Sequence, residues 1–242
     1  MRLEETFKIG IREIGMSNKI TNYGFLAFLE DIATVHSDLV GYGIKDRVIR
    51  KGAWLLMDWG LEVKNRLPFN SKIKVITYAV SQEKPSYHSY RNFEIYDENN
   101  NLIATATSKW LYYNFETKRI TKIDEDMMRL YNPEGNIEES EKKLTKLVEQ
   151  STYENMTGYE VKRSDLDINE HVNNLNYLKL AYEILPEDVY FGEEPNNLRI
   201  TYKHQIKLGS KIKCFYTYTQ NKHCIAIKSE DEKILHSIIE LW

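Results

Sequence analysis

Three side chains that can handle protons or polar carbonyl groups stand at alternate positions in DLDINEHVNNLNY, residues 165–177. They are Asp167, Asn169 and His171, and an apolar periodic run follows them. Alternate side chains of an extended segment point to the same face, so this spacing predicts a cluster in a cleft at the start of a helix. Histidine has the unperturbed pKa of a general base near neutral pH, and an amide both donates and accepts hydrogen bonds.

The cluster predicts activation of a water molecule by His171, with Asp167 as an acceptor that holds the ring. Asn169 would position the water or a carbonyl oxygen, and amide donors at the helix N-terminus would stabilise developing negative charge. A structural alternative stays open. In that case Asp167 and Asn169 are loop and capping residues, and His171 is an ordinary histidine of the first helical turn.

The elements that must position this cluster belong to an internal repeat. SKIKV at 71–75 recurs as SKIKC at 210–214, and NLIATATSKW at 101–110 corresponds to KILHSIIELW at 233–242. TNYGFLAFLED at 21–31 corresponds to NNLNYLKLAYE at 173–183. In this alignment the three positions of the cluster hold Gly15, Ser17 and Lys19 in the first copy, so we expect its chemistry only in the second copy.

Each copy predicts one long helix followed by β-rich runs, because apolar residues keep helical spacing first and turn signals separate strand-like segments afterwards. The expected class is α+β, with a helix and a curved antiparallel sheet written twice and the two sheets joined edge to edge. We expect an N-terminal domain at 1–123 and a C-terminal domain at 151–242. The acidic, polar range 124–150 between them predicts a linker.

Composition limits the class of protein. The chain has 242 residues, of which 42% are hydrophobic and 29% charged, as in an ordinary globular protein. It has no apolar run of about 18 residues, so no membrane span is predicted. MRLEETFKIGIREIG lacks the apolar core of a secretory signal, and we expect a cytoplasmic protein. Cys214 and Cys224 lack CxxC spacing and predict neither a zinc site nor a disulfide framework.

The net charge of −3 hides a basic stretch, and we expect no nucleic-acid partner. Residues 195–229 contain no Asp or Glu. Their basic side chains are Arg199, Lys203, Lys207, Lys211, Lys213, Lys222 and Lys228. Strand alternation would place Arg199, Lys203 and Lys207 on one face together with Gln205, unless a bulge intervenes.

DLDINEHVNN followed by NYLKLAYEILP resembles the signature of the acyl-acyl-carrier-protein thioesterases of plant plastids and bacteria, which have a double hotdog fold. Further segments resemble this family in the same order along nearly the whole chain. They are GAWLLMDWGLEVKNRLPFNSKIKV at 52–75, SKWLYYNFETKRITKI at 108–123 and LRITYKHQIKLGSKI at 198–212.

The resemblance implies hydrolysis of fatty acyl thioesters on acyl carrier protein, a step of fatty acid biosynthesis, with no metal or dissociable cofactor. The acidic carrier protein would dock on Arg199, Lys203 and Lys207 and present its phosphopantetheine arm to the Asp167, Asn169 and His171 cluster. The first copy would supply the apolar acyl pocket. The pocket candidates are Trp54, Trp59, Phe25, Phe28 and Met57, for which ordinary core packing is the alternative.

Two positions depart from the family pattern. Plant members carry a Tyr-Arg-Arg-Glu-Cys stretch. It corresponds to residues 202–206 of this chain, which lie within the sequence TYKHQIK that begins at Thr201. Glutamate is replaced by Gln205 and cysteine by Ile206. A cysteine nucleophile is therefore absent at this place, which favours direct attack by water. Gln205 can align water but cannot accept its proton, so His171 and Asp167 must supply the base.

Other functions stay open at this point. An acyl-CoA thioesterase would use the same chemistry, a non-catalytic acyl-binding hotdog protein would explain the missing glutamate, and an interaction protein would carry an incidental histidine. The absence of a GxSxG motif argues against a serine α/β-hydrolase. The sequence predicts neither the acyl chain length nor its saturation, and a homodimer is compatible with it.

Overall fold

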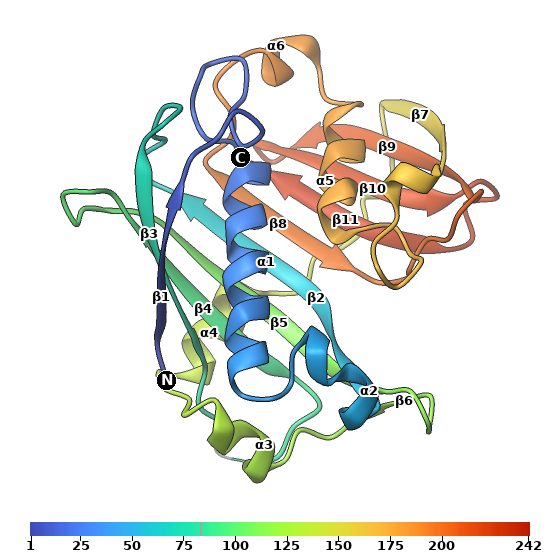
Figure 1. Cartoon of the computed structure of the whole chain (residues 1–242). Helices are drawn as coiled ribbons and strands as arrows, with labels where there is room; N and C mark the ends of the chain where they lie inside the picture. Colours follow the sequence, from blue (N-terminus) through green and yellow to red (C-terminus); the bar gives the residue numbers. More distant parts are fainter. Residues whose placement is uncertain (83) are drawn as a thin grey trace. The chain divides into compact units, whose positions relative to one another are not determined.

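Each half of the sequence forms its own helix and antiparallel sheet in the computed structural model, which describes residues 1–82 and 84–242 (Figure 1). The chain divides into two units, Met1–Thr145 and Lys146–Trp242. No helix of the described residues is both long and apolar enough to cross a bilayer.

The first unit contains a sheet with the strand order β1-β3-β4-β5-β2, in which β6 pairs with β5. Its strands are β1 (Leu3–Lys8), β2 (Gly52–Val63), β3 (Lys72–Ala79), β4 (Ser89–Tyr96), β5 (Leu102–Asn114) and β6 (Arg119–Thr121). Its helices are α1 (Asn22–Leu39), the 3-10 helix η1 (Ile44–Asp46), α2 (Arg47–Arg50), α3 (Glu125–Leu130) and α4 (Ile137–Lys143). All pairings within this sheet are antiparallel.

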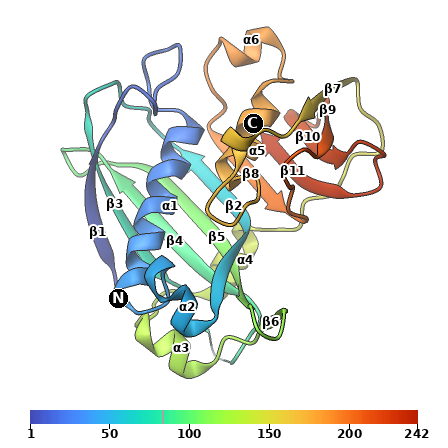
Figure 2. The ribbon, with the colours of Figure 1, turned by 45° about the vertical axis from the view of Figure 1, so that its right-hand side comes forward.

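Helix α1 crosses one face of this sheet (Figures 1 and 2) and packs on β3 and β1. It begins after Thr21, whose Oγ1 accepts a hydrogen bond from the Gly24 N–H at 3.0 Å, a typical N-cap. The residues Phe25, Leu29 and Ile32 follow helical spacing and are fully buried. Burial of this stripe, rather than helix propensity alone, stabilises α1 against the sheet.

The second unit repeats the arrangement with a shorter helix. Its strands are β7 (Asn155–Glu160), β8 (Asn197–Tyr202), β9 (Lys211–Thr219), β10 (Lys222–Ser229) and β11 (Leu235–Leu241), in the order β7-β9-β10-β11-β8. Its helices are the 3-10 helix η2 (Arg163–Asp165), α5 (Asn174–Tyr182) and α6 (Glu187–Tyr190). Helix α5 packs on β10 and β11.

The two strand orders are the same when β1 to β5 are matched with β7 to β11 in chain order. SKIKV and SKIKC fall on β3 and β9, and the two segments that close on a Trp fall on β5 and β11. The repeat predicted from the sequence is therefore confirmed at the level of strand topology. The expected edge-to-edge joining of the sheets stays a prediction.

The range 124–150 contains two helices and several buried side chains, which its polar composition does not indicate. Met127, Met128 and Tyr131 are buried in one cluster with Tyr112 and Ile123 of the first unit. Asp124 caps α3 by accepting a hydrogen bond from the Met127 N–H at 2.8 Å. The first unit thus extends to Thr145, beyond the boundary expected at residue 123, because the apolar side of α3 completes its core.

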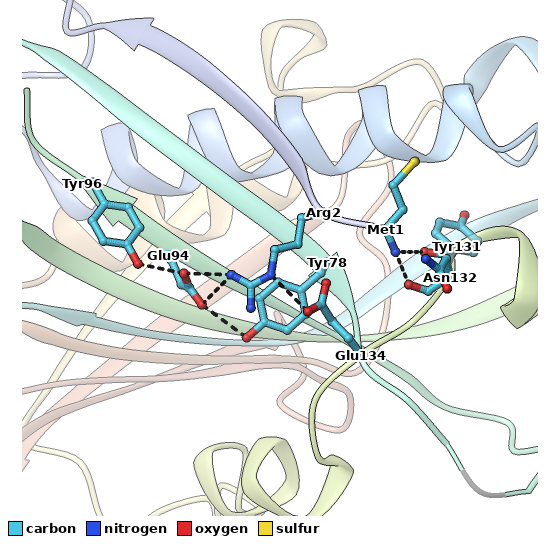
Figure 3. A network of polar contacts seen from close by, with 8 residues as sticks. All are labelled: Met1, Arg2, Tyr78, Glu94, Tyr96, Tyr131, Asn132 and Glu134. Carbon is cyan, nitrogen blue, oxygen red and sulfur yellow. Dashed lines mark hydrogen bonds and ion pairs between the residues drawn. The ribbon is translucent and has the colours of Figure 1, made fainter. Parts of the chain in front are cut away.

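A polar network ties the start of β1 to its neighbours (Figure 3). Arg2 Nε donates to Glu134 Oε2 at 3.1 Å, and Arg2 Nη1 lies 3.3 Å from Glu94 Oε2. Tyr96 donates its hydroxyl to Glu94 Oε2 at 2.8 Å. The Arg2 side chain is 46% exposed, so each of these ion pairs contributes no more than about 1 kcal/mol.

Candidate active site

Asp167, Asn169 and His171 lie in one tight turn between η2 and α5. The Asp167 N–H donates to the His171 carbonyl oxygen at 2.8 Å, and the Glu170 N–H donates to the Asp167 carbonyl oxygen at 3.1 Å. Glu170 adopts the left-handed conformation, with φ of 61°. The Val172 N–H donates to the Ile206 carbonyl oxygen at 2.9 Å, which fastens the turn to the segment that follows β8.

The Asp167 carboxylate organises this turn. Its Oδ1 accepts hydrogen bonds from the backbone N–H of Asn169 at 2.8 Å and of His171 at 3.4 Å. Its Oδ2 accepts one from Asn169 Nδ2 at 3.0 Å. Asn169 and Asp167 therefore lie together with a defined amide orientation, and Asn169 retains a second amide N–H for another acceptor.

The His171 ring is held differently from the prediction. Asp167 contacts the backbone N–H of His171 and not its ring, because the carboxylate oxygens serve the backbone of the turn, as acids in such turns commonly do. His171 is half-buried, and its Nδ1 is buried without a hydrogen-bond partner among the residues that the structure describes. The expectation that Asp167 holds the imidazole is thus wrong for this arrangement.

The segment 203–207 lies directly beside the turn. Strand β8 ends at Tyr202, and Lys207 forms an isolated antiparallel bridge with His171. Ile206 is 1% exposed, whereas its neighbours Gln205 and Lys207 are exposed. Gln205 and Lys207 therefore share the solvent side of a segment whose backbone contacts the turn. Ile206, the residue that the sequence resemblance aligns with a cysteine, is therefore a buried aliphatic side chain.

Arg199 does not belong to an exposed basic face. It lies inside β8 opposite Glu240 of β11 and is only 6% exposed. Leu198 and Ile200 on either side are also buried, so both faces of β8 are covered and strand alternation does not expose the arginine. The predicted docking set is corrected accordingly, because only Lys203 and Lys207 of its three members are exposed.

The four other lysines of this basic stretch all have acidic partners. Lys213 Nζ lies 2.6 Å from Glu232 Oε1, and Lys222 Nζ lies 2.7 Å from Glu240 Oε2. Two further pairs join Lys211 with Glu230 and Lys228 with Glu149. Lys203 and Lys207 form no ion pair with any residue that the structure describes. The unneutralised positive charge of this stretch thus concentrates beside the turn.

The pocket candidates lie in two aromatic groups of the first unit. Phe25 and Phe28 are buried on α1, and the Phe28 ring lies 4.9 Å from the Phe7 ring. Trp54 and Met57 lie on β2 and are partly exposed. Trp54 donates its Nε1 hydrogen to the Tyr131 hydroxyl at 2.9 Å and contacts the Tyr112 ring edge-on at 5.3 Å. Trp59 is fully buried against Phe93.

Sequence reasoning missed a buried polar pair in the first unit. Arg91 Nη1 lies 2.6 Å from His36 Nδ1 and donates to Thr77 Oγ1 at 3.2 Å. His36 is fully buried and Arg91 is 6% exposed. Burial, followed by the Arg91 charge, lowers the pKa of His36 to about 3, and burial lowers the pKa of Arg91 to about 10. His36 is therefore neutral and accepts at Nδ1. Its helical spacing from Phe25, Leu29 and Ile32 placed it on the buried face, but its partner lies 55 residues away.

Among the described residues, no group of three or more His, Cys, Asp or Glu side chains is arranged to hold a metal ion. The turn itself carries an imidazole, an amide and a carboxylate group. These groups suit proton transfer and orientation of a polar carbonyl.

A long helix packed on an antiparallel sheet, formed twice with the same strand order, defines a tandem hotdog protein. Family profiles then identify the particular group. The acyl-ACP thioesterase N-terminal domain matches residues 2–131, and the acyl-ACP thioesterase C-terminal domain matches residues 148–240. The chain belongs to the acyl-ACP thioesterase family.

Curated relatives include the chloroplastic oleoyl-acyl carrier protein thioesterase of Coriandrum sativum, 25% identical over 220 residues that cover 84% of this chain and 58% of the relative. Oleoyl-acyl carrier protein thioesterase 1 of Arabidopsis thaliana is 24% identical over 234 residues, which cover 89% of this chain and 64% of the relative. The chain thus spans about three fifths of the length of these relatives.

Solved structures confirm the double hotdog fold. The acyl-ACP thioesterase of Bacteroides thetaiotaomicron has a TM-score of 0.81 at 17% identity. The 12:0-ACP thioesterase of Umbellularia californica has a TM-score of 0.82 at 17% identity. Each similarity covers 99% of this chain and 96% of the other chain.

Proposed function

We propose that this protein hydrolyses fatty acyl thioesters on acyl carrier protein and releases a free fatty acid, as a step of fatty acid biosynthesis. The observation that carries the proposal is the turn at 165–173. In a chain of this family it joins an imidazole, a positioned amide and a carboxylate beside an unneutralised basic segment. The relatives are named as acyl carrier protein thioesterases, which supports the same substrate class.

His171 is the proposed general base. It takes a proton from water as the water oxygen attacks the thioester carbonyl carbon, and the second amide N–H of Asn169 stabilises the developing oxyanion. The tetrahedral intermediate then collapses, the C–S bond breaks, and His171 returns the proton to the leaving pantetheine thiolate. Asp167 fixes the Asn169 amide through the hydrogen bond at 3.0 Å and fixes the backbone of His171.

Gln205 acts as a water-orienting residue in this proposal. It is exposed in the segment whose backbone bridges His171 through Lys207. A glutamine amide can donate to and accept from a water molecule, yet it cannot take the proton of that water. Proton transfer therefore depends on His171 alone.

Lys203 and Lys207 form the proposed docking site for the acidic carrier protein. Both are exposed, and neither has an ion-pair partner in the described part of the chain. Because Lys207 is paired with His171 in an antiparallel bridge, a carrier held there would present its phosphopantetheine arm close to the base. Opposite charge at the site mouth raises the rate of association.

The first unit supplies the proposed acyl pocket. Phe25, Phe28, Trp54 and Met57 offer apolar surface on α1 and β2, and apolar surface favours a fatty acyl chain. The second half then carries the catalytic residues. The expected cytoplasmic location and a homodimer stay predictions.

The test compares hydrolysis of the same acyl chain on acyl carrier protein and on coenzyme A by the purified protein. We expect a higher kcat/KM on the carrier protein. Lys203→Glu with Lys207→Glu should raise KM for the carrier substrate about tenfold, roughly 1.4 kcal/mol, with kcat nearly unchanged. Lys122→Glu with Lys146→Glu is the matched control, since it changes the net charge equally at exposed lysines outside the basic stretch 195–229.

Each alternative has its own outcome. Faster turnover of the coenzyme A substrate would assign an acyl-CoA thioesterase. Acyl binding without turnover of either substrate would assign a non-catalytic acyl-binding protein. An unchanged KM for the lysine double variant at low ionic strength would place the carrier elsewhere while leaving hydrolysis intact.

A further inference from the structure

The segment Ile44–Lys51, here called the α2 knob, exposes two aliphatic side chains at its tip. Val48 is 86% exposed and Ile49 is 80% exposed, more than any other large hydrophobic residue among those described. Ile44 in the same segment is 51% exposed. Single exposed aliphatic residues are ordinary on protein surfaces, whereas adjacent ones at this exposure indicate a surface that another body covers.

Basic residues surround these aliphatic side chains. Four of the eight residues of the knob are Lys45, Arg47, Arg50 and Lys51, against Asp46 as its single acid. The β5–β6 hairpin lies beside α2 in both views of the ribbon (Figures 1 and 2) and adds the exposed Lys118 and Arg119. Lys45 lies 3.6 Å from Asp38 and Lys51 forms an ion pair with Glu116 of the hairpin, so the excess positive charge around the tip comes from Arg47, Arg50, Lys118 and Arg119.

The knob is fastened to the first unit by its basic side chains. Arg50 Nε donates to the Gly41 carbonyl oxygen at 2.9 Å. The Arg47 guanidinium lies 5.5 Å from the centre of the Phe115 ring, and the Phe115 N–H donates to the Lys51 carbonyl oxygen at 2.8 Å. These contacts hold the knob against the hairpin while Val48 and Ile49 stay in solvent.

We propose that the α2 knob is a reversible contact for an anionic lipid surface, with Val48 and Ile49 in the interfacial region and the basic side chains at the headgroups. Adjacent apolar and basic groups on a small protruding element are the combination that binds such a surface. An acidic protein partner would satisfy the charges but would need an apolar recess to cover the protruding aliphatic pair. A lipid surface accommodates such a pair without a preformed recess.

Vesicle flotation tests this contact with the full chain. Vesicles of phosphatidylcholine alone are compared with vesicles that also contain phosphatidylglycerol, at low and high salt. We expect co-flotation with the anionic vesicles at low salt and its loss at high salt, because screening weakens the attraction. Val48→Ser with Ile49→Ser keeps the charge and should lower the partition coefficient about tenfold.

A matched control separates this knob from apolar exposure in general. Ile11 and Met16 are 73% and 78% exposed in another segment of the first unit, so Ile11→Ser with Met16→Ser should leave partitioning unchanged. A fluorescent label supplies a second measurement. The native Cys214 and Cys224 are 1% and 3% exposed, so Ile49→Cys allows selective labelling. An environment-sensitive dye there should shift to the blue on anionic vesicles, and the same dye at Ile11→Cys should not.

Four results would overturn the proposal. They are equal partitioning of Val48→Ser with Ile49→Ser and the parent, equal partitioning into neutral and anionic vesicles, no binding to either vesicle, and the absence of a dye shift at Ile49→Cys. If the knob variant instead raises KM for a carrier-bound substrate with vesicle binding unchanged, the surface belongs to a protein partner. If sedimentation shows that it splits a dimer, the surface belongs to a second copy.

Discussion

The turns Glu13–Thr21 and Asp165–Asn173 have the same backbone in the two units and different side chains. The Gly15 N–H donates to the Lys19 carbonyl oxygen at 3.0 Å, as the Asp167 N–H does to that of His171 at 2.8 Å. Asn18 and Glu170 occupy the same left-handed position, with φ of 60° and 61°. The conformation of the turn therefore belongs to the fold and does not by itself mark a site.

One acid is shared by the two turns and another is not. Glu13 Oε2 accepts a hydrogen bond from the Gly10 N–H at 2.9 Å, and Asp165 Oδ2 accepts one from the Lys162 N–H at 2.7 Å. This acid recurs because the backbone of both copies needs it. Asp167 has no counterpart, since Gly15 stands at its position. Comparison of the copies thus separates a carboxylate that both turns need from one that only the second turn has.

The two units also differ in the burial of a histidine. His36 is fully buried beside the Arg91 guanidinium, and its lowered pKa of about 3 keeps it neutral at any physiological pH. His171 is half-buried on a turn beside exposed residues. A base must exchange protons with water, so the proposed role falls to His171 and a structural role falls to His36.

The largest expected effect comes from removal of the proposed base. His171→Ala should lower kcat by about 10²- to 10⁴-fold, because proton transfer from water is lost. Lys19→Ala changes the equivalent position of the first turn and should leave kcat unchanged. Steady-state hydrolysis of a carrier-bound substrate measures both, and thermal unfolding checks that both variants fold. Turnover of His171→Ala near that of the parent would remove this histidine from the mechanism.

The next largest effect is expected from Asp167, whose carboxylate has no counterpart in the first turn. Asp167→Ala frees the Asn169 amide and the His171 backbone, and misplacement of such groups lowers kcat by up to about 10²-fold. Asn169→Ala should show a loss of similar size, and the double variant should lose less than the two losses combined, since one contact joins the pair. Ser17→Ala in the first turn is the control. Fully additive losses would show that Asp167 does not act through Asn169.

A smaller effect is expected at Gln205, where the family pattern has a carboxylate. Gln205→Glu should add a group with an ordinary pKa near 4.3 beside the proposed site and alter the acid limb of the pH–rate profile. At pH values above about 4.3, where the new carboxyl group is ionised, kcat of Gln205→Glu should exceed that of the parent by about tenfold or less. Profiles of variant and parent that overlay at all pH values would place residue 205 outside the reacting centre.

The sequence predicted those features that depend on local pattern. SKIKV and SKIKC lie on the equivalent strands β3 and β9, so the repeat followed from the aligned segments, whereas the strand order comes from the structure. The alternation of Asp167, Asn169 and His171 predicted that these residues lie together before a helix, but the extended backbone assumed for them is a tight turn in the structure. Helical spacing also held Phe25, Leu29 and Ile32 on the buried face of α1.

The features that the sequence missed depend on contacts between distant residues. Arg199 is buried because both faces of β8 are covered, and a strand's own alternation does not reveal that. Asp167 binds backbone N–H groups rather than the imidazole, a choice set by the curvature of the turn. Arg91 and His36 meet between a strand and a helix far apart in the chain.

The smallest expected effect exchanges the left-handed residues of the two turns. An asparagine tolerates this conformation better than a glutamate does, because its short polar side chain hydrogen-bonds locally and offsets the close approach of Cβ to the following carbonyl oxygen. Glu170→Asn should therefore stabilise the second turn by about 0.5–1 kcal/mol, and Asn18→Glu should destabilise the first turn by a similar amount. Urea unfolding of both variants measures these changes.

The Glu170→Asn variant also tests whether Glu170 takes part in the hydrolysis. Its side chain is exposed, and it forms no hydrogen bond or ion pair with Asn169, His171 or any other residue that the structure describes. Glu170→Asn should thus keep kcat within about twofold of the parent, a difference smaller than about 0.4 kcal/mol in the barrier. A tenfold loss of kcat with stability unchanged would contradict this expectation. The contrast between the two turns would then extend to a fourth side chain, and the carboxylate missing at Gln205 would have a substitute at residue 170.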